Sequence, residues 1–277
     1  MIVSKNKMSF RQKSAHLSCL VLFILAMCTA SLSHAKVLKV CYDQWPPMTI
    51  FPTKQAPARG VVIEMLESIY ASSGYAVEYY EVPLARGLDM VAEGLCDMLP
   101  EYLFSKHAEK GFVYGGEETF AYSSAFIVRR NDSWRYNGVQ SIKNKRVATG
   151  PGWDYSSMSA DYQNYLDDPK NSKFIEVIAG SDDIIDRIFR MIIDDRVDLY
   201  VDNDLVLQYV LNQLGLNEEL EIVRPGLEKK LHERPIFSSR IPKSIRQNLI
   251  KIWDEGRLSF KGEKERVLLK KYNVTFE

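Results

Sequence analysis

The chain has 277 residues, with 36 basic side chains, 36 acidic side chains and 4 His, so its formal net charge at pH 7 is zero. It has no basic tail and no long charge block, which argues against nucleic-acid binding because such proteins carry a basic footprint. The His residues show no metal-ligand spacing, so we expect no metal and no other cofactor.

The first 35 residues have the pattern of an export signal. A basic start precedes an apolar run from Leu17 to Ala30, and Ser33 and Ala35 are the small residues that a signal peptidase reads. The apolar run is shorter than the roughly 20 residues that span a bilayer. We therefore expect a signal peptide over residues 1–35, cleaved near Ala35, and a periplasmic mature chain; an uncleaved N-terminal anchor is the alternative. The segment holds four basic and no acidic residues, so cleavage leaves 32 basic and 36 acidic residues and a net charge of −4.

The mature chain begins with alternating strand and helix patterns. A strand is predicted over 36–42, and two consecutive prolines end it because they forbid both helix and central strand. Next come a helix over 61–73, with Val62, Met65, Leu66 and Ile69 on its inner face, and a strand over 76–82. A second helix follows, with the apolar face Leu84, Leu88, Val91 and Leu95, and it ends at Gly94. A strand over 95–99 completes this unit.

The second half continues the alternation. A helix is expected from Trp153 onward, with Asp154 and Ser156 able to cap its first N–H groups. The remaining predicted strands cover 125–130, 145–149, 174–178, 197–201 and 220–223, and the remaining helices cover 181–193, 205–214 and 243–256, with a short one after them.

Only Cys41 and Cys96 remain in the mature chain, since Cys19 and Cys28 leave with the signal. Two cysteines do not make a disulfide framework. Both lie in apolar, strand-like runs, so we expect buried free thiols rather than a bridge.

Strand–helix alternation predicts an α/β fold with mostly parallel sheets covered by helices. Two segments, 94–105 and 195–204, share one layout: a helix end, an acidic strand start and a polar strand end. Two similar lobes that face each other across a cleft would produce this repetition. Ligands in open α/β sheets gather beyond the carboxyl ends of the strands, so we look for the site at Glu101, Tyr102 and Ser105.

Four motifs occur in the order Trp45-Pro46-Pro47, Val82-Pro83-Leu84 with Arg86, Gly94-x-x-Asp97, and Val197-Asp198 with acidic residues at the strand end. Together they resemble the family 3 extracellular solute-binding proteins, the periplasmic receptors for polar amino acids. The resemblance covers essentially the whole mature chain. It implies the type II periplasmic-binding fold, with lobe 1 formed by 36–124 plus 226–277 and lobe 2 by 125–225. It further implies a monomer whose lobes close over a small-molecule ligand by hinge motion, with a membrane transporter or sensor as partner.

The resemblance also implies site residues. Leu84 would form an apolar platform, residues 101–105 would supply polar partners, and the turn 152–155 would offer helix N-terminal N–H groups to a carboxylate. The chain departs from the family pattern at three places. Ala108 stands where α-amino acid receptors carry a carboxylate-binding Arg. Asn203, flanked by Asp202 and Asp204, stands where an Asp holds the ammonium, and Trp153, Asp154 and Tyr155 replace small hydroxyl residues.

Each candidate has a structural alternative. Trp45 is either a stacking face or a lid on its own lobe, and Arg86 is either a substitute carboxylate clamp or a solvated helix residue. Ser105 is a ligand contact or a cap, while Asp97 and Asp198 are expected to bond local backbone. The candidate set is Trp45, Leu84, Arg86, Glu101, Tyr102, Ser105, Trp153, Asp154, Tyr155, Asp202 and Asn203.

These features predict an exported binding protein for a small polar metabolite, amino-acid-like or cationic, rather than an enzyme. Aromatic and acidic candidates together favour a ligand of aromatic or cationic character. One alternative is an enzyme that resembles the cyclohexadienyl dehydratases, with Glu101 as general acid beside Arg86. The other is a degenerate, ligand-free lobe pair used for protein contact.

Overall fold

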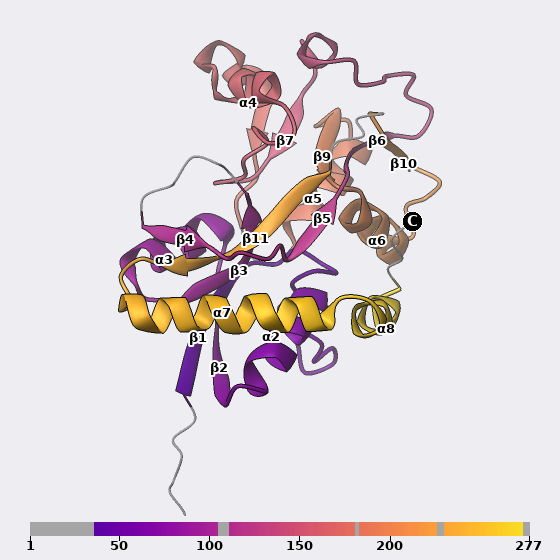
Figure 1. Ribbon diagram of the computed structural model, residues 1–277. Coiled ribbons are helices and arrows are strands. Elements are labelled where there is room, and N and C mark those ends of the chain that lie inside the picture. Colours follow the sequence, from indigo (N-terminus) through magenta and orange to yellow (C-terminus); the bar gives the residue numbers. More distant parts are fainter. Residues whose placement is uncertain (1–35, 105–110, 181–182, 226–229, 274–277) are drawn as a thin grey trace, which may run out of the picture. The chain divides into compact units, whose positions relative to one another are not determined.

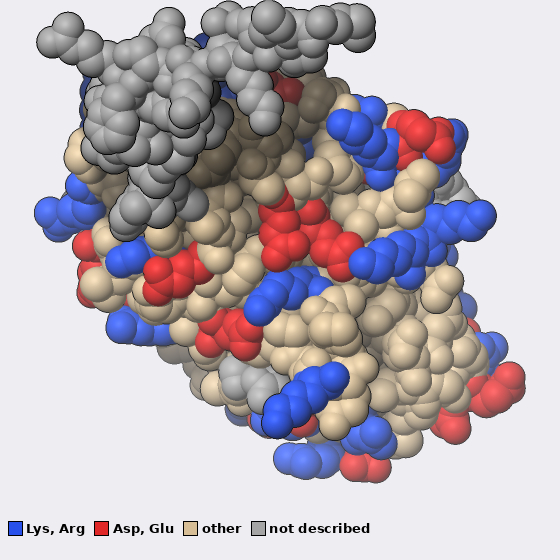
Figure 2. Space-filling view, turned by 90° about the horizontal axis from the view of Figure 1, so that it is seen from below, with Lys and Arg blue, Asp and Glu red and all other residues tan. Residues whose placement is uncertain are grey.

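The computed structural model describes residues 36–104, 111–180, 183–225 and 230–273 (Figure 1). The predicted signal peptide and Ser105 therefore lie outside the described residues, as does Ala108. Within the described residues, no helix is both long enough and apolar enough to cross a membrane. On the face shown in Figure 2, acidic and basic side chains are interspersed without a large patch of one sign.

Lobe 1 is built on a six-stranded sheet with the order β2-β1-β3-β11-β4, in which β5 also pairs with β11. Strand β1 is parallel to β2 and β3, whereas β11 is antiparallel to β3, β4 and β5. The strands are β1 (Lys36–Tyr42), β2 (Tyr75–Glu81), β3 (Met98–Leu103), β4 (Phe112–Tyr114), β5 (Phe120–Tyr122) and β11 (Leu231–Ser238).

Lobe 2 is built on a five-stranded sheet with the order β10-β6-β9-β7-β8. Strand β7 is parallel to β8 and β9, whereas β6 is antiparallel to β9 and β10. The strands are β6 (Ser124–Arg129), β7 (Val147–Thr149), β8 (Ile175–Val177), β9 (Leu199–Asn203) and β10 (Leu220–Val223).

The predicted α/β fold with two lobes is confirmed, but each sheet is mixed rather than mostly parallel. The antiparallel pairs involve β6 and β11. The chain passes from lobe 1 to lobe 2 between Tyr122 and Ser124, where β6 begins, and returns between Val223 and Leu231, where β11 begins. Each of these two strands enters its sheet directly from the other lobe, without the crossover helix that usually connects parallel strands.

The helices bury their apolar faces against the sheets and against one another. Those of lobe 1 are α2 (Val61–Ala71), α3 (Leu84–Glu93), α7 (Lys243–Phe260) and α8 (Glu263–Lys271). The predicted inner face of α2 is fully or almost fully buried, and α2 packs on the long helix α7, where Tyr70 Oη donates to the carbonyl of Leu249 at 3.0 Å (Figure 1). The helices of lobe 2 are α4 (Ala160–Asp167), α5 (Ile184–Ile193) and α6 (Asp204–Leu214), with short 3₁₀ helices η1 (Val139–Ile142) and η2 (Pro169–Phe174).

Helix α3 ends at Gly94, as predicted, in a left-handed conformation with φ of 80°. Its buried face is Gly87, Met90 and Val91, so the predicted face is only partly right. Leu95 is 47% exposed because it follows the Gly94 turn and no longer continues the helix. At Gly87 a Cβ would lie 3.1 Å from Leu99 Cδ1, so this glycine lets α3 approach β3 closely.

The predicted helix at Trp153 is wrong. Gly152, with φ of +81°, turns the chain instead, and Asp154 uses its carboxylate locally to accept from Ser156 N at 2.8 Å. Such side-chain turns compete with helix formation. Helix α4 begins only at Ala160, where the Ser159 hydroxyl accepts from Tyr162 N at 3.2 Å.

The prediction of free thiols is also wrong, because Cys41 and Cys96 form a disulfide with a Cα–Cα distance of 5.9 Å. Val40 of β1 pairs with Met98 of β3, and Cys41, one residue after Val40, lies close in space to Cys96, two residues before Met98. Both cysteines are fully buried, which is what the apolar sequence around them indicated. Disulfides of this kind persist in oxidising compartments outside the cytoplasm.

Candidate binding site

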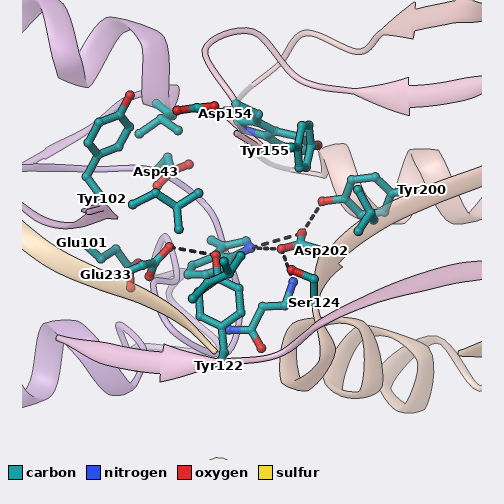
Figure 3. A pocket seen from close by; sticks show the side chains of 17 residues that line it. Asp43, Glu101, Tyr102, Tyr122, Ser124, Asp154, Tyr155, Tyr200, Asp202 and Glu233 are labelled. Atoms are coloured by element: carbon teal, nitrogen blue, oxygen red, sulfur yellow. Dashed lines mark hydrogen bonds between the residues drawn. The ribbon is translucent and has the colours of Figure 1, made fainter. Parts of the chain in front are cut away.

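A pocket lies between the two lobes, at the carboxyl ends of β1, β3 and β9 (Figure 3). It contains about 730 Å³ of empty space, part of which is open to solvent. The residues that line it are Asp43, Trp45, Leu84, Glu101, Tyr102, Leu103, Tyr122, Ser124, Trp153, Asp154, Tyr155, Tyr200, Val201, Asp202, Asn203, Leu231 and Glu233.

The pocket brings together nine of the eleven residues that the sequence suggested. They are Trp45, Leu84, Glu101, Tyr102, Trp153, Asp154, Tyr155, Asp202 and Asn203. Arg86 does not line the pocket and is exposed on α3. Leu84 lines the pocket from the same helix. Two positions along an α-helix correspond to a rotation of about 200°, so the side chain of Arg86 points away from the pocket.

Sequence reasoning missed several lining residues, of which Asp43, Tyr122, Ser124, Tyr200 and Glu233 carry polar groups. Asp43 was visible in principle, because it follows the first strand directly and precedes Trp45. Glu233 lies on β11, a strand that was not predicted, and Tyr122 lies on β5, a strand of three residues that was not predicted either.

Two buried glutamates face the pocket from lobe 1 on the adjacent strands β3 and β11. Glu101 is 5% exposed and Glu233 is 6% exposed. Neither carboxylate oxygen of Glu101 has a hydrogen-bond partner in the described part of the chain; Thr49 lies near enough to favour the ionised form but makes no bond of ordinary geometry. Glu233 accepts a long bond of 3.4 Å from Tyr122 Oη at one oxygen, and its other oxygen is unpaired within the described residues.

Burial raises the pKa of both glutamates well above the usual range, and nearby carboxylates add to the shift. For Glu101 these neighbours are Glu233, Asp43 and Asp202. Burial likewise raises the pKa of Asp43 to about 7, with a further contribution from Asp202. The described residues that line the pocket include no Lys and no Arg, so the acids have no positive side chain opposite them there.

Asp202, on lobe 2, lines the same pocket, is partly buried and accepts several hydrogen bonds. It accepts from Trp45 Nε1 at 3.1 and 3.2 Å, from Asn203 N at 2.7 Å and from the Tyr200 hydroxyl. Burial raises its pKa to about 6, while these three donors act in the opposite direction. Because Trp45 belongs to lobe 1, the Trp45–Asp202 bond joins the two lobes across the pocket.

Trp45 is therefore held at both ends of its ring system. Its N–H group donates to Asp202, and its ring meets Tyr122 edge-on with 5.9 Å between centroids. It lines the pocket as expected, but its orientation is fixed by lobe 2 as much as by the Pro46–Pro47 loop.

The 152–155 turn forms the other wall of the pocket. Trp153 covers Gly150, where a Cβ would lie only 2.5 Å from its ring, and it packs against Tyr200 with 5.7 Å between centroids. Asp154 accepts from the backbone N and the hydroxyl of Ser156. Since no helix begins here, the helix N-terminal carboxylate site that the resemblance implied is not formed.

Several predicted polar residues have structural roles. Asn203 Oδ1 accepts from Leu205 N at 2.9 Å and caps α6, while its Nδ2 is buried and unpaired among the described residues. Asp204 lies 3.6 Å from Arg224 in an ion pair and does not line the pocket. Asp97 accepts from Lys39 N at 2.8 Å, and Asp198 accepts from Arg146 N at 2.7 Å. Both aspartates bond backbone, as expected, but the backbone belongs to strand-forming segments more than 50 residues earlier in the chain rather than to local residues.

Solved structures with the same fold are binding proteins and sensor domains. A histidine kinase sensor domain with similarity to periplasmic binding proteins matches with a TM-score of 0.68 and 16% identity, over 85% of this chain and 95% of that chain. An ancestral arginine-binding protein bound to arginine matches with a TM-score of 0.67 and 16% identity, over 86% and 99%. An ABC uptake transporter substrate-binding protein from Streptococcus pneumoniae with bound histidine has a TM-score of 0.67 and 14% identity, over 85% and 92%.

No protein-family model and no curated protein matches the chain. The structural matches nevertheless establish the fold, which is that of the solute-binding proteins of amino acid ABC transporters. This confirms the type II periplasmic-binding architecture that the sequence motifs indicated.

Proposed function

We propose that this protein is an exported solute-binding protein that holds a small organic cation between its lobes, for delivery to a membrane transporter or for presentation to a sensor. The observation that carries this proposal is Glu101, a buried carboxylate that faces the pocket with both oxygens unpartnered among the described residues. A buried carboxyl group without partners is costly unless it is protonated or a cation compensates it. A ligand cation supplies that compensation.

The walls of the pocket suit a cation as well. Trp153, Tyr155 and Tyr102 present aromatic side chains close to the acids, and aromatic faces attract ammonium and guanidinium groups. The fold similarity to receptors bound to arginine and histidine supports a ligand with a basic group. The similarity to a sensor domain supports presentation of the ligand to a sensor as the alternative to its delivery to a transporter.

Export is supported by two independent features. The first 35 residues have the composition of a cleaved signal peptide. The Cys41–Cys96 disulfide suits an oxidising compartment, and both features are in accord with a periplasmic protein.

The dehydratase-like alternative has less support. It requires a cation beside Glu101 to hold a substrate carboxylate, and Arg86, which was the candidate for that role, is exposed on α3 and does not line the pocket.

Thermal unfolding of the purified protein against a chemical panel tests the proposal. Primary amines and guanidinium compounds are expected to raise the midpoint in a saturable way, because a ligand that binds only the folded state stabilises it. Dicarboxylates and neutral sugars are expected to leave the midpoint unchanged.

Glu101→Gln is expected to remove the response to cations, whereas Glu93→Gln, an exposed residue on α3, serves as the matched control. A response to dicarboxylates alone, or a full response to cations in Glu101→Gln, would contradict the proposal.

A further inference from the structure

The acids of the pocket are distributed over both lobes, and this distribution constrains the ligand. We propose that the ligand is an organic dication without a carboxylate group, of the aliphatic diamine or amino-guanidine type. This inference rests on the proposed function and narrows it to a class of compounds.

The first argument concerns the carboxylate. An α-amino acid would bring a negative group into a pocket where Asp43, Glu101 and Glu233 face one another. Once the ammonium group of the ligand has displaced protons from these acids, the ligand carboxylate would lie in the same pocket as their negative charges, and like charges at short range repel. The described lining contains no Lys or Arg to receive that group. Its buried unpaired donor, Asn203 Nδ2, adjoins Asp202 in the chain, whose negative charge opposes an anion there.

The turn at 152–155 reinforces this argument. A helix beginning at this point would offer free N–H groups and a favourable dipole to a carboxylate. The chain instead forms a turn in which Asp154 places its own carboxylate on the pocket wall. A group that would repel a ligand carboxylate thus stands where the resemblance implied a carboxylate site.

The second argument concerns the number of positive charges. Glu101 and Glu233 lie on neighbouring strands of lobe 1 and, with Asp43, form one anionic position. Asp154 is a second anionic position, contributed by lobe 2 (Figure 3). A single cation compensates only one of these positions. A dication compensates both and contacts both lobes at the same time.

Apolar and aromatic side chains line the same pocket as the two anionic positions. Leu84 from α3 and the rings of Trp153 and Tyr155 line the pocket together with the acids. A short hydrocarbon chain between two cationic groups fits such a surface, since burying its methylene groups is favourable.

Isothermal titration calorimetry with matched compound pairs tests the two arguments separately. Agmatine against arginine and cadaverine against lysine differ in the carboxylate group, and putrescine against butylamine differs in the second charge. We expect each carboxylate-free dication to bind at least about tenfold more tightly than its partner compound.

Asp154→Asn sharpens the second comparison, since the amide keeps the oxygen that accepts from Ser156 N. It is expected to reduce the preference for putrescine over butylamine several-fold, because it weakens putrescine binding more than butylamine binding. Asp161→Asn, an exposed residue of the same lobe, is the control and is expected to behave as the wild type.

Binding of arginine as tight as agmatine, or of butylamine as tight as putrescine, would overturn this inference while the cation-binding proposal stands. Absence of binding by every compound, together with no cation response in the thermal panel, would overturn both.

Discussion

Glu101 and Asp202 are carboxylates that line the same pocket, Glu101 buried and Asp202 partly buried, and they differ in their hydrogen-bond partners. Asp202 receives hydrogen bonds from Trp45, Tyr200 and Asn203, whereas Glu101 has no partner for either oxygen in the described part of the chain. Burial raises the pKa of both groups. A raised pKa therefore does not separate these two carboxylates, whereas their hydrogen-bond partners do. Asp202 accepts from residues of both lobes and links them, and Glu101 is the acid that we propose for ligand binding.

The largest expected effect follows from deleting each carboxylate in turn. Asp202→Ala is expected to lower the free energy of unfolding by about 3 kcal/mol, because three donors lose their acceptor, two of them on the buried residues Tyr200 and Asn203. For a chain of this length that corresponds to a midpoint lower by roughly 10 °C. Glu101→Gln is expected to leave the midpoint unchanged or to raise it, because it removes an uncompensated acid.

Thermal unfolding of both variants at pH 7.5 measures this contrast. Equal losses in the two variants would show that Glu101 is held by partners as Asp202 is, and would remove the basis of the comparison.

The second prediction concerns pH and the stability of the protein without added ligand. A carboxyl group with a raised pKa keeps its proton in the folded state after the unfolded chain has lost it, so unfolding becomes easier as pH rises. For Asp43 the window runs from about pH 4, its ordinary pKa, to about 7. At about 1.4 kcal/mol per pKa unit, we expect a loss on the order of 3 kcal/mol between pH 5 and pH 8, read from urea unfolding at these two pH values.

Asp43→Asn removes one of the responsible groups and is expected to flatten this pH profile. An exposed group, as in Asp161→Asn, provides the control. A stability that rises between pH 5 and pH 8 in the wild type would contradict the assignment of raised pKa values to the pocket acids.

The third prediction is that cation affinity increases as the pH rises, whereas the stability of the protein without ligand decreases. A cation must displace a proton from the glutamate pair, so the dissociation constant is expected to fall as the pH rises, by up to about tenfold per pH unit. This fall ends at the pH where the glutamates are already ionised in the ligand-free protein. Calorimetry at pH 6, 7 and 8 in buffers of different ionisation enthalpy measures both the affinity and the protons released. Binding that is independent of pH and releases no proton would show that the acids are already ionised.

Part of this arrangement was predictable from sequence because its signals are local. The run from β1 to β3 was predicted in the right order, since helical and strand periods and the Gly94 stop are encoded within a few residues of each element. Trp45, Glu101 and Asp202 were found by the same logic, because each lies at or just beyond the end of a recognisable strand.

What was missed depends on distant pairing. Strand β11 carries His232, Glu233, Arg234 and Pro235 in its first half and therefore lacks an apolar alternation; it is a strand because β3, β4 and β5 pair with it. With β11 missing, its site residue Glu233 was missing too. The Cys41–Cys96 bond is of the same type, since 55 residues separate the two thiols and only the β1–β3 pairing brings them together.

The smallest expected effect tests whether Trp45 and Asp202 act as one unit. Trp45→Phe keeps an aromatic ring against Tyr122 but removes the N–H donor, and we expect it to cost about 1 kcal/mol. In the Asp202→Ala background the same change is expected to cost almost nothing more, because the bond is already absent. Urea unfolding of the wild type, both single variants and the double variant gives the coupling energy. Simple addition of the two losses would mean that the bond across the pocket contributes no stability, and Asp202 would then be available to a ligand in the same sense as Glu101.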